Sequence, residues 1–375
     1  MQLEKSTFPR TKRTGRPYGV KPLRIGLEIS SLAFPLSGIQ VYINNVVSSL
    51  LRTDTTNQYL LTTKLKQFLK LRAYRASPSW SGHFDVFHGF DGFLPVLVRA
   101  ELKSAIVHDV LYLKNRNYHT EEQRKRLLKK LYHLVRRADI IISPSLATKV
   151  ELSDIFPPEK IFVIPEGCSE AFKPMPETAV QSFRQGLGTG RYILFVGVFQ
   201  RRKNIERLLD AFRIIKKESP GLKLVMVTSY FGYGSREVMQ KISEMKDDIL
   251  LKVGVEQEEL ISLYNGAEVF LFPSLAEGFG LPVLEAMACG TPVVTSRLSA
   301  MPETGGDAVA YCDPYDVGDI AATALDVLNN DSRKLELRRL GMSRAAAFSW
   351  SESAKKLLSV WEESLARKRE GGSSH

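Results

Sequence analysis

Short apolar segments alternate with helix-length amphipathic segments along almost the whole chain, from about residue 22 onward. Each apolar segment has the length of a buried strand. The strands expected are 23–29, 58–63, 84–89, 104–109, 138–143 and 160–165 in the first half, and 192–197, 222–228, 249–254, 268–273 and 291–296 in the second. Strands that alternate with helices are typical of parallel, doubly wound sheets, so the pattern predicts an α/β fold.

The alternation is interrupted once, at 165–190, where Pro, Gly and polar residues replace the apolar periodicity. A chain of 375 residues is long enough for two domains, so the interruption predicts a linker near the middle. The expected parts are a basic, flexible extension at 1–21, a first Rossmann-like domain at 22–170, a linker at 171–190, a second Rossmann-like domain at 191–348, a helix at 349–370 that packs back toward the first domain, and a flexible tail at 371–375.

The composition is that of a globular protein, with 44% apolar and 25% charged residues. Three cysteines without CxxC spacing and six scattered histidines make neither a disulfide framework nor a metal cluster, which indicates a reducing compartment. The first twenty residues lack the apolar core of a signal peptide, and no run of about 18 uncharged apolar residues occurs. We therefore expect a cytoplasmic protein.

The net charge of +11 is concentrated in three segments, 1–21, 64–75 and 121–137. Such clusters can bind nucleic acid, phosphorylated ligands or anionic membranes. No nucleic-acid-binding motif accompanies them, so no nucleic acid partner is expected. Segment 64–75 (KLKQFLKLRAYR) can form either an amphipathic helix on an anionic membrane surface or a helix that packs on the sheet. Segment 121–137 is a second candidate for peripheral contact with the inner face of the cytoplasmic membrane.

Two glutamates, Glu277 and Glu285, lie close together around a glycine-rich turn in the stretch SLAEGFGLPVLEAMACGTPVVTS. The pattern predicts a strand, a turn and then a helix that begins near Pro282, so the amides of Gly280 and Leu281 would favour an anion. Ionised carboxylates accept paired hydrogen bonds, which vicinal sugar hydroxyls can donate. Alternatively, one glutamate caps the helix and the other is an ordinary surface residue. The combined pattern favours a ligand site.

A second strand-to-helix turn, in VGVFQRRKNIERLLDAF, carries Gly197, Arg201, Arg202 and Lys203, with Asn204 placed to cap the helix. Clustered cations at such a turn suit a diphosphate, because they neutralise the charge that develops when a nucleoside diphosphate departs. The alternative is that these are surface residues in the first turn of a helix.

These segments resemble a known family. EGFGLPVLEAMACGTPVV matches the E-x7-E signature of family-4-type retaining glycosyltransferases, and the similarity extends over nearly the whole chain, including SLYNGAEVFLFPS, MPETGGDAVAYCDP and FSWSESAKKLL. RRKN resembles the PRKN form of the family's diphosphate-binding pair, which favours Arg202 over Arg201 as the partner of Lys203. The chain is most similar to bacterial enzymes that transfer mannose from GDP-mannose.

The resemblance implies a GT-B architecture, in which two Rossmann-like domains face a central cleft, and a hexosyl transfer that forms an α-glycosidic bond. The co-substrate would be a nucleotide sugar, with GDP-mannose favoured, and the acceptor a glycan or lipid-linked saccharide. No cofactor and no metal are expected, because protein cations would stabilise the leaving diphosphate.

The resemblance also implies the roles of individual residues. The expected catalytic residues are His108, at the end of the predicted strand SAIVHD, with Lys203 and Glu277. Glu277 would contact the donor sugar, and Glu285 the ribose. The expected donor-binding residues are Gly38, Gly197, Arg202, Lys203, Glu277, Gly278, Phe279, Gly280, Leu281 and Glu285. Gly38 lies in the loop PLSGIQ, where a glycine lets the backbone pass close to the donor; Tyr42 and Asn45, one turn further on, are candidates to face the acceptor.

Three other functions remain as alternatives. A glycosidase would need its two carboxylates across a scissile bond, whereas Glu277 and Glu285 flank an anion-binding helix start. A nucleotide-sugar 2-epimerase of the same fold would need acid and base groups at the sugar C2. A non-catalytic sugar-nucleotide-binding protein would not need to keep Glu277, Glu285, Lys203 and His108 together.

Overall fold

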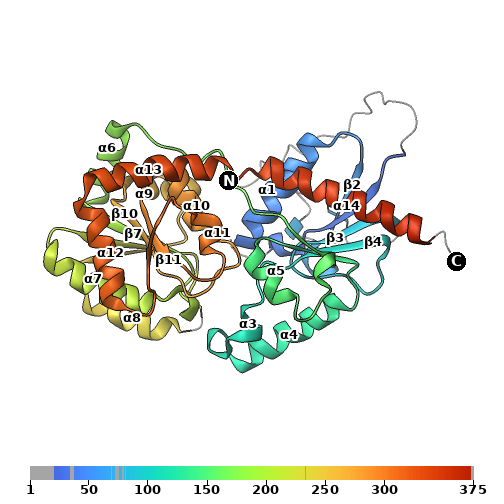
Figure 1. The fold of residues 1–375 in the computed structure, drawn as a ribbon, viewed down its shortest axis with the longest axis horizontal. Helices are drawn as coiled ribbons and strands as arrows, with labels where there is room; N and C mark the ends of the chain where they lie inside the picture. Colours follow the sequence, from blue (N-terminus) through green and yellow to red (C-terminus); the bar gives the residue numbers. More distant parts are fainter. Residues whose placement is uncertain are drawn as a thin grey trace. The chain divides into compact units, whose positions relative to one another are not determined.

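The computed structural model describes residues 21–33, 38–68, 70–71, 76–77, 80, 82–232 and 234–372. The chain forms two compact units, each with its own sheet (Figure 1). Unit 1 comprises Met1–Val110, Glu122–Gly167 and Ser349–His375, and unit 2 comprises Leu111–Glu121 and Cys168–Phe348. Both units are therefore built from segments that are distant in the sequence.

Unit 1 contains a six-stranded parallel sheet with the order β2-β1-β3-β4-β5-β6. Its central strands are buried and apolar, as parallel strands covered on both faces must be; β5, with the sequence IIIS, is buried along its whole length. The strands are β1 Arg24–Glu28, β2 Gln58–Thr62, β3 His83–Gly89, β4 Arg99–Ile106, β5 Ile140–Ser143 and β6 Ile161–Val163.

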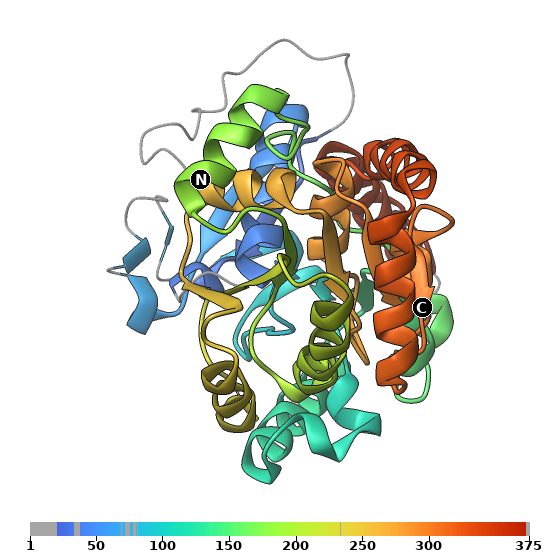
Figure 2. The same cartoon turned by 90° about the vertical axis from the view of Figure 1, so that its left-hand side faces the viewer.

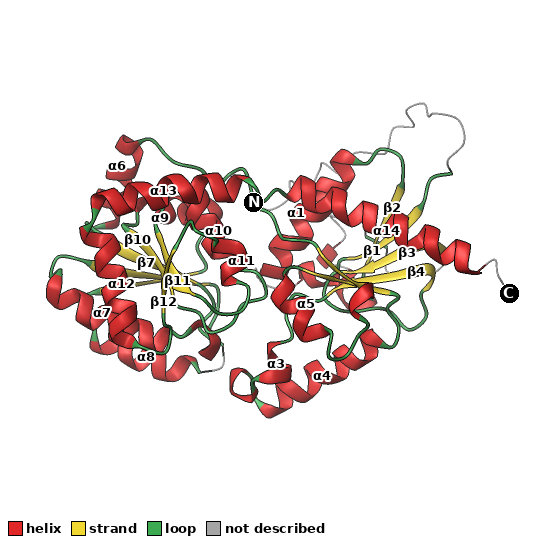
Figure 3. Ribbon diagram, viewed as in Figure 1, coloured by secondary structure: helices red, strands yellow, loops and turns green. Residues whose placement is uncertain are grey.

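Helices lie on both sides of this sheet (Figure 3). Besides two short 3-10 turns, η1 Ser30–Ala33 and η4 Pro158–Lys160, the helices are α1 Gly38–Thr53, α2 Leu65–Phe68, α4 Glu121–Val135, α5 Leu146–Leu152 and α14 Trp350–Gly372. No helix within the described ranges combines the length and the apolar character needed to cross a membrane.

The terminal helix α14 packs on unit 1, against α1, β3 and β4. Its buried apolar residues recur every three or four positions, which places them on one face of the helix; they are Trp350, Ala354, Leu357, Trp361 and Leu365. Trp361 is fully buried, and its Nε1 donates to Oγ of Ser104 in β4 at 3.1 Å. The end of the chain is therefore part of the unit that contains its beginning.

Unit 2 contains a second six-stranded parallel sheet, with the order β12-β11-β10-β7-β8-β9. Two stacked rings, Phe270 and Phe272 of β10, lie in its core at 5.5 Å between centroids. The strands are β7 Tyr192–Val196, β8 Lys223–Thr228, β9 Ile249–Val253, β10 Val269–Phe272, β11 Val293–Ser296 and β12 Ala310–Cys312.

Helices also surround the strands of unit 2, as the perpendicular view in Figure 2 shows. The helices are α3 Leu111–Lys114, α6 Glu177–Leu187, α7 Ile205–Glu218, α8 Ser235–Glu244, α9 Gln257–Gly266, α10 Leu281–Ala288, α11 Met301–Gly305, α12 Val317–Asn329 and α13 Asp331–Ala346, with 3-10 turns η3 Arg116–Tyr118 and η5 Arg201–Lys203.

The prediction of an α/β fold with two doubly wound parallel sheets is confirmed. Each predicted strand overlaps one of β1 to β11, whereas the short β12 was not predicted. Strand β4 begins at Arg99 and ends at Ile106, so His108 lies two residues beyond the strand that it was expected to end. The prediction missed the first half of β4 because polar and apolar residues alternate there.

The segment 171–190, expected as a linker, belongs to unit 2 and contains α6, which packs against α9. Its proline and glycine residues mark the two ends of this helix rather than an unstructured connection. Pro176 immediately precedes α6, and Gly188 ends it in the left-handed conformation, with φ of 69°.

The expected start of the tail at residue 371 was also wrong, because α14 continues to Gly372. In segment 64–75, the described residues include the four-residue helix α2 and the 3-10 residues 70–71, of which Leu71 is buried. The rest of the predicted membrane helix lies largely outside the described residues. Most of the predicted extension at 1–21 lies outside them as well.

Candidate functional site

The strand order of unit 2 reverses between the neighbouring strands β7 and β10. In open α/β sheets, ligands bind beyond the carboxyl ends of the strands at such a reversal. The turn that carries Gly197, Arg202 and Lys203 follows β7, and the turn that carries Glu277 follows β10. The topology therefore brings the two predicted turns to one place.

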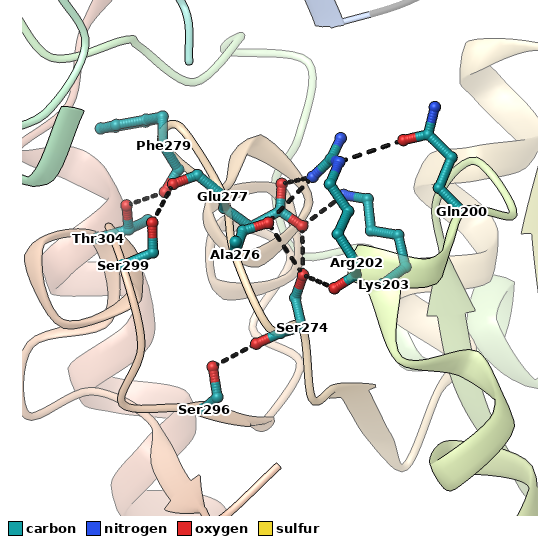
Figure 4. A network of polar contacts seen from close by, with 10 residues as sticks. All are labelled: Gln200, Arg202, Lys203, Ser274, Ala276, Glu277, Phe279, Ser296, Ser299 and Thr304. Carbon is teal, nitrogen blue, oxygen red and sulfur yellow. Dashed lines mark hydrogen bonds and ion pairs between the residues drawn. The ribbon is translucent and has the colours of Figure 1, made fainter. Parts of the chain in front are cut away.

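Glu277 joins these turns through a buried ion-pair cluster (Figure 4). Its Oε1 accepts from Nζ of Lys203 at 2.6 Å and from Oγ of Ser274 at 2.6 Å, and its Oε2 accepts from Nη1 of Arg202 at 2.5 Å. The side chains of Glu277 and Lys203 are both 7% exposed. Because two cations face one carboxylate, the cluster keeps a net positive charge.

The electrostatics keep Glu277 ionised. Burial alone would raise the pKa of this carboxyl, but the charges of Arg202 and Lys203 and the hydrogen bonds from Lys203 and Ser274 outweigh it and lower the pKa from 4.5 to about 2. A carboxyl with this pKa carries no proton at neutral pH. Glu277 can therefore accept hydrogen bonds but cannot act as a general acid.

The two arginines of the β7 turn point to different places. Besides its bond to Glu277, Arg202 donates two hydrogen bonds. Nε donates to Oε1 of Gln200 at 3.1 Å, and Nη1 donates to the carbonyl oxygen of Ala276 at 3.2 Å. Arg201 is exposed and lies along Gly234, where an added Cβ would come within 2.6 Å of the Arg201 side chain. The structure thus brings Arg202, and not Arg201, together with Lys203 and Glu277.

Asn204 has a different role from the expected one. It occupies the position before α7, but its side chain makes no capping hydrogen bond. Instead, Nδ2 donates to the carbonyls of Pro273 at 3.0 Å and Pro314 at 2.6 Å. The backbone is left-handed with φ of 58°, a conformation that asparagine tolerates better than most residues. Asn204 therefore ties the β7 turn to the chain beyond β10 and β12.

Three side-chain hydroxyls hold the backbone of the turn after β10 (Figure 4). Each donates to a carbonyl oxygen of this turn: Ser296 to Ser274 at 2.6 Å, Ser299 to Glu277 at 2.7 Å, and Thr304 to Phe279 at 2.6 Å. Since the donors come from β11, α11 and the loop between them, these elements fix the shape of the turn.

Gly280 ends this turn and precedes α10. Its φ of 112° and ψ of 44° are strained for any other residue, and an added Cβ would lie 2.4 Å from Cε of Met301. Among the described residues, the amides of Gly280 and Leu281 donate to no protein oxygen. α10 begins at Leu281, with Pro282 second, and Gly290 follows it with φ of 76°. The helix start predicted near Pro282 is therefore formed.

Glu285 lies inside α10, apart from the cation cluster. Its Oε2 accepts from the hydroxyl of the fully buried Tyr264 at 3.0 Å. Burial and the charge of Glu285 together raise the pKa of this phenol well above 10.0, so the hydroxyl remains a donor. Tyr264 thereby fixes the orientation of the Glu285 carboxylate.

Two predicted site residues belong to unit 1. His108 follows β4 and contacts Glu166 and the carbonyl of Phe90. Gly38 is the first residue of α1, and an added Cβ would meet no atom within 4 Å, so the described structure places no steric demand for glycine there. Of the acceptor candidates in α1, Tyr42 is fully buried and Nδ2 of Asn45 donates to the carbonyl of Val41 at 2.7 Å.

The sequence analysis missed two residues that hold predicted ones in place. Ser274 bonds Glu277 and lies three residues before it, a spacing that could have identified it. Glu166 bonds His108 but lies 58 residues away, in the segment that we interpreted as the start of a linker. Within the described ranges, no group of three or more His, Cys, Asp or Glu side chains could hold a metal ion.

Known proteins resemble this chain in sequence and in fold. The sequence model of the family described as "Glycosyl transferases group 1" matches residues 179–343. The O-antigen chain mannosyltransferase B of Escherichia coli is 30% identical over 285 residues, 74% of each protein. The MMP alpha-(1->4)-mannosyltransferase of Mycolicibacterium hassiacum is 29% identical over 350 residues, 84% of this chain and 81% of that relative. Sucrose-phosphate synthase from Thermosynechococcus elongatus has a similar fold, with a TM-score of 0.74, 20% identity, and coverage of 92% of this chain and 100% of that one.

Proposed function

Since this chain belongs to the group 1 glycosyltransferases, we propose that it transfers a mannosyl residue from a nucleoside diphosphate mannose to a glycan or lipid-linked saccharide. Two relatives named as mannosyltransferases, each aligned over about three quarters or more of both chains, support the choice of sugar. The donor that we favour is GDP-mannose, and the product is an α-glycoside formed with retention of the anomeric configuration.

The observation that carries this proposal is the cation cluster at the strand reversal of unit 2. Arg202 and Lys203 lie within 2.6 Å of the same carboxylate and leave a net positive charge beside the start of α10. A departing nucleoside diphosphate gains negative charge, which fixed cations and helix N-terminal amides stabilise. Because the guanidinium and the ammonium supply this charge, we propose that the transfer requires no metal and no cofactor.

In this proposal, different site residues bind different parts of the donor. Arg202, Lys203 and the amides from Gly278 to Leu281 bind the diphosphate, and Gly197 lets the stem of Lys203 pack closely against the β7 turn. Glu277 accepts hydrogen bonds from sugar hydroxyls, and Glu285, oriented by Tyr264, accepts those of the ribose. The pKa of Glu277, about 2, supports this binding role and disfavours proton transfer by Glu277.

The transfer itself is driven by departure of the leaving group. The C1–O bond to the diphosphate breaks and the acceptor oxygen attacks C1 from the same face, so the configuration is retained. The proton of the acceptor hydroxyl passes to the departing diphosphate oxygen. His108 is proposed as a further residue of this reaction.

A donor panel tests the proposal. The purified chain is incubated with GDP-, UDP- and ADP-linked hexoses and mannosylated acceptors, with and without EDTA, while nucleoside diphosphate release and the anomeric proton of the product are followed. With GDP-mannose as the donor, we expect the release of GDP. This release should require an acceptor, should persist in the presence of EDTA and should be abolished by Glu285→Ala. Turnover by Glu285→Ala equal to that of the wild type would contradict the assigned site, and epimerised sugar without acceptor would indicate a 2-epimerase.

We also propose a cytoplasmic location with peripheral contact to an anionic membrane through α4. This helix carries exposed cations, including Lys125 and Arg126. Arg137, just beyond it, donates to the carbonyl of Val96 at 2.5 Å, and the neighbouring Leu97 is 83% exposed. Flotation with vesicles of phosphatidylglycerol and phosphatidylcholine tests this contact. Binding should require the anionic lipid and weaken in Lys125→Glu/Arg126→Glu; no binding to either vesicle would refute it.

A further inference from the structure

A buried carboxylate and a partly buried imidazole meet at the carboxyl edge of the unit 1 sheet. Glu166, 5% exposed, follows β6, and His108 follows β4; the two strands flank β5. Nδ1 of His108 lies 3.1 Å from Oε1 of Glu166. Nε2 of the same ring lies 3.2 Å from the carbonyl oxygen of Phe90, which follows β3. Three strand ends thus converge on one histidine ring.

Both partners of the His108 ring are oxygens that only accept hydrogen bonds. A neutral imidazole has one N–H, so one ring nitrogen would present a lone pair to an oxygen lone pair. The imidazolium has two N–H groups and satisfies both contacts. The geometry therefore selects the doubly protonated ring, which forms an ion pair with Glu166.

The surrounding charges act in the same direction. Burial alone would lower the pKa of His108, but the hydrogen bond and charge of Glu166, the charge of Asp91 and the Phe90 carbonyl outweigh it and raise the pKa above 6.5. His88 of β3 is the nearby histidine, and its own pKa is lowered to about 3 by burial and by the charge of His108, so it remains neutral. Glu166 and Asp91 are therefore the charged groups that face the imidazolium.

Two further donors lie beside this pair without partners. The ring of Tyr42 in α1 is 5.0 Å from that of His108, edge to face, and 5.5 Å from that of Trp350. Among the described residues, the buried Tyr42 hydroxyl and the buried Nε1 of Trp350 have no hydrogen-bond partner. A buried donor without a partner costs about 1–3 kcal/mol, which suggests a ligand oxygen at this edge of the sheet rather than an ordinary core.

We propose that Glu166 is a positioning residue of the transfer reaction, which holds His108 as an oriented imidazolium through Nδ1–H. His108 then serves as a fixed cation rather than as a proton shuttle, because both of its N–H groups are bound within unit 1. This role deepens the proposed glycosyl transfer and rests on it.

Glu166→Gln tests the pair, since glutamine keeps the size and an acceptor oxygen but loses the charge. The titration of His108 is followed in the full chain by ring ¹⁵N NMR, with the signal assigned through His108→Gln. In the wild type, His108 should remain doubly protonated above pH 6.5, and Glu166→Gln should lower its midpoint by about 1–3 pH units. Glu166→Asp should retain the raised midpoint, and Glu159→Gln, an exposed carboxylate near β6, should leave it unchanged.

The pH profile of kcat/KM connects the pair to turnover. The alkaline limb should move to lower pH in Glu166→Gln by the shift seen in the NMR titration, and Glu166→Asp should restore it. If kcat/KM fell by the same factor at every pH and the alkaline limb kept its position, Glu166 would have a structural role and the proposal would be overturned. A wild-type His108 that titrates below pH 6.5 would also overturn it, a measurement that needs no variant to fold.

The two measurements separate this inference from the proposed function. The NMR titration requires no substrate. If it shifts as expected while no mannosyl donor is turned over, the proposed donor fails and the Glu166–His108 pair stands. If mannosyl transfer is observed but the titration is the same in Glu166→Gln, the pair is refuted and the transfer stands.

Discussion

The Nζ atom of Lys203 lies 2.6 Å from Oε1 of Glu277, and both side chains are almost completely buried. The same ammonium lies 4.6 Å from the centre of the Phe272 ring, so an aromatic face and a carboxylate share this cation. Arg202 binds the second carboxylate oxygen. The cations of the proposed donor site are therefore held in place before any diphosphate arrives, which is the pre-organisation that electrostatic catalysis needs.

Loss of the Lys203 charge should reduce turnover while the fold is kept. Lys203→Met removes the ammonium but keeps an unbranched side chain against Phe272. We expect kcat/KM to fall by about 10²–10³-fold, the usual effect of removing one group that stabilises developing charge. Steady-state kinetics and circular dichroism measure the two parts of this expectation. The control is Lys217→Met at an exposed position of α7; equal kinetics in the two variants would contradict the role of Lys203.

Acid should destabilise the protein in part through Glu277. Its folded pKa, about 2, lies below the ordinary 4.5, so its contribution is complete above pH 4.5 and disappears as the pH falls toward 2. At about 1.4 kcal/mol per pKa unit, linkage makes this contribution about 3 kcal/mol. Urea unfolding at pH 7, 5, 4 and 3 should show a smaller loss of stability in Glu277→Gln than in the wild type. Glu258→Gln, at an exposed position in unit 2, should keep the wild-type loss; the same loss in all three proteins would refute the linkage.

Removal of the Thr304 hydroxyl should loosen the turn that carries Glu277. Thr304 is fully buried and donates to the Phe279 carbonyl at 2.6 Å. Thr304→Val leaves that carbonyl without a donor, at a cost of about 1–3 kcal/mol in unfolding free energy. The KM for the donor should rise in parallel. Thr304→Ser, which keeps the hydroxyl, should recover most of the donor affinity, and a Ser variant as weak as the Val variant would assign the effect to packing.

Alanine at position 280 should lower the stability of the protein, whereas alanine at position 186 should not. Gly280→Ala forces a Cβ within 2.4 Å of Met301 and places a side chain at φ of 112°. We expect a loss of about 1–3 kcal/mol in unfolding free energy and weaker donor binding. Gly186→Ala lies within α6, where a Cβ meets nothing within 4 Å, and should gain about 0.5–1 kcal/mol. Urea denaturation compares the two, and equal effects would rule out the strain at Gly280.

Much of this architecture follows from local sequence patterns. Runs such as IIIS and VFLF are buried on both faces, so their hydrophobicity alone predicts them as strands. β12 was missed because it has three residues and too short a pattern. The first half of β4 was missed because Glu101 and Lys103 interrupt its apolar run; Arg369 of α14 donates to Glu101 at 2.7 Å, and Lys103 donates its amide to Asp139 at 2.8 Å.

The site was predictable only in part, for a related reason. Arg202, Lys203 and Glu277 lie on two turns with recognisable composition, and the strand order brings the turns together. Contacts between distant residues leave no local pattern, so the pair of His108 and Glu166 could not be predicted. Asn204 shows a further limit, because its place before a helix suggested a cap, whereas its side chain bonds Pro273 and Pro314.

The position of α14 has a consequence for synthesis of the protein. Trp361 and the other buried residues of this helix complete unit 1, yet they follow all of unit 2 in the chain. On the ribosome, the strands β1 to β6 emerge first, and the surface that receives α14 stays uncovered while more than half of the chain is still to be made. The unit that begins first is therefore the last to be finished. A polypeptide released before α14 is made would carry a completed unit 2 and a unit 1 whose apolar α14-binding surface is uncovered.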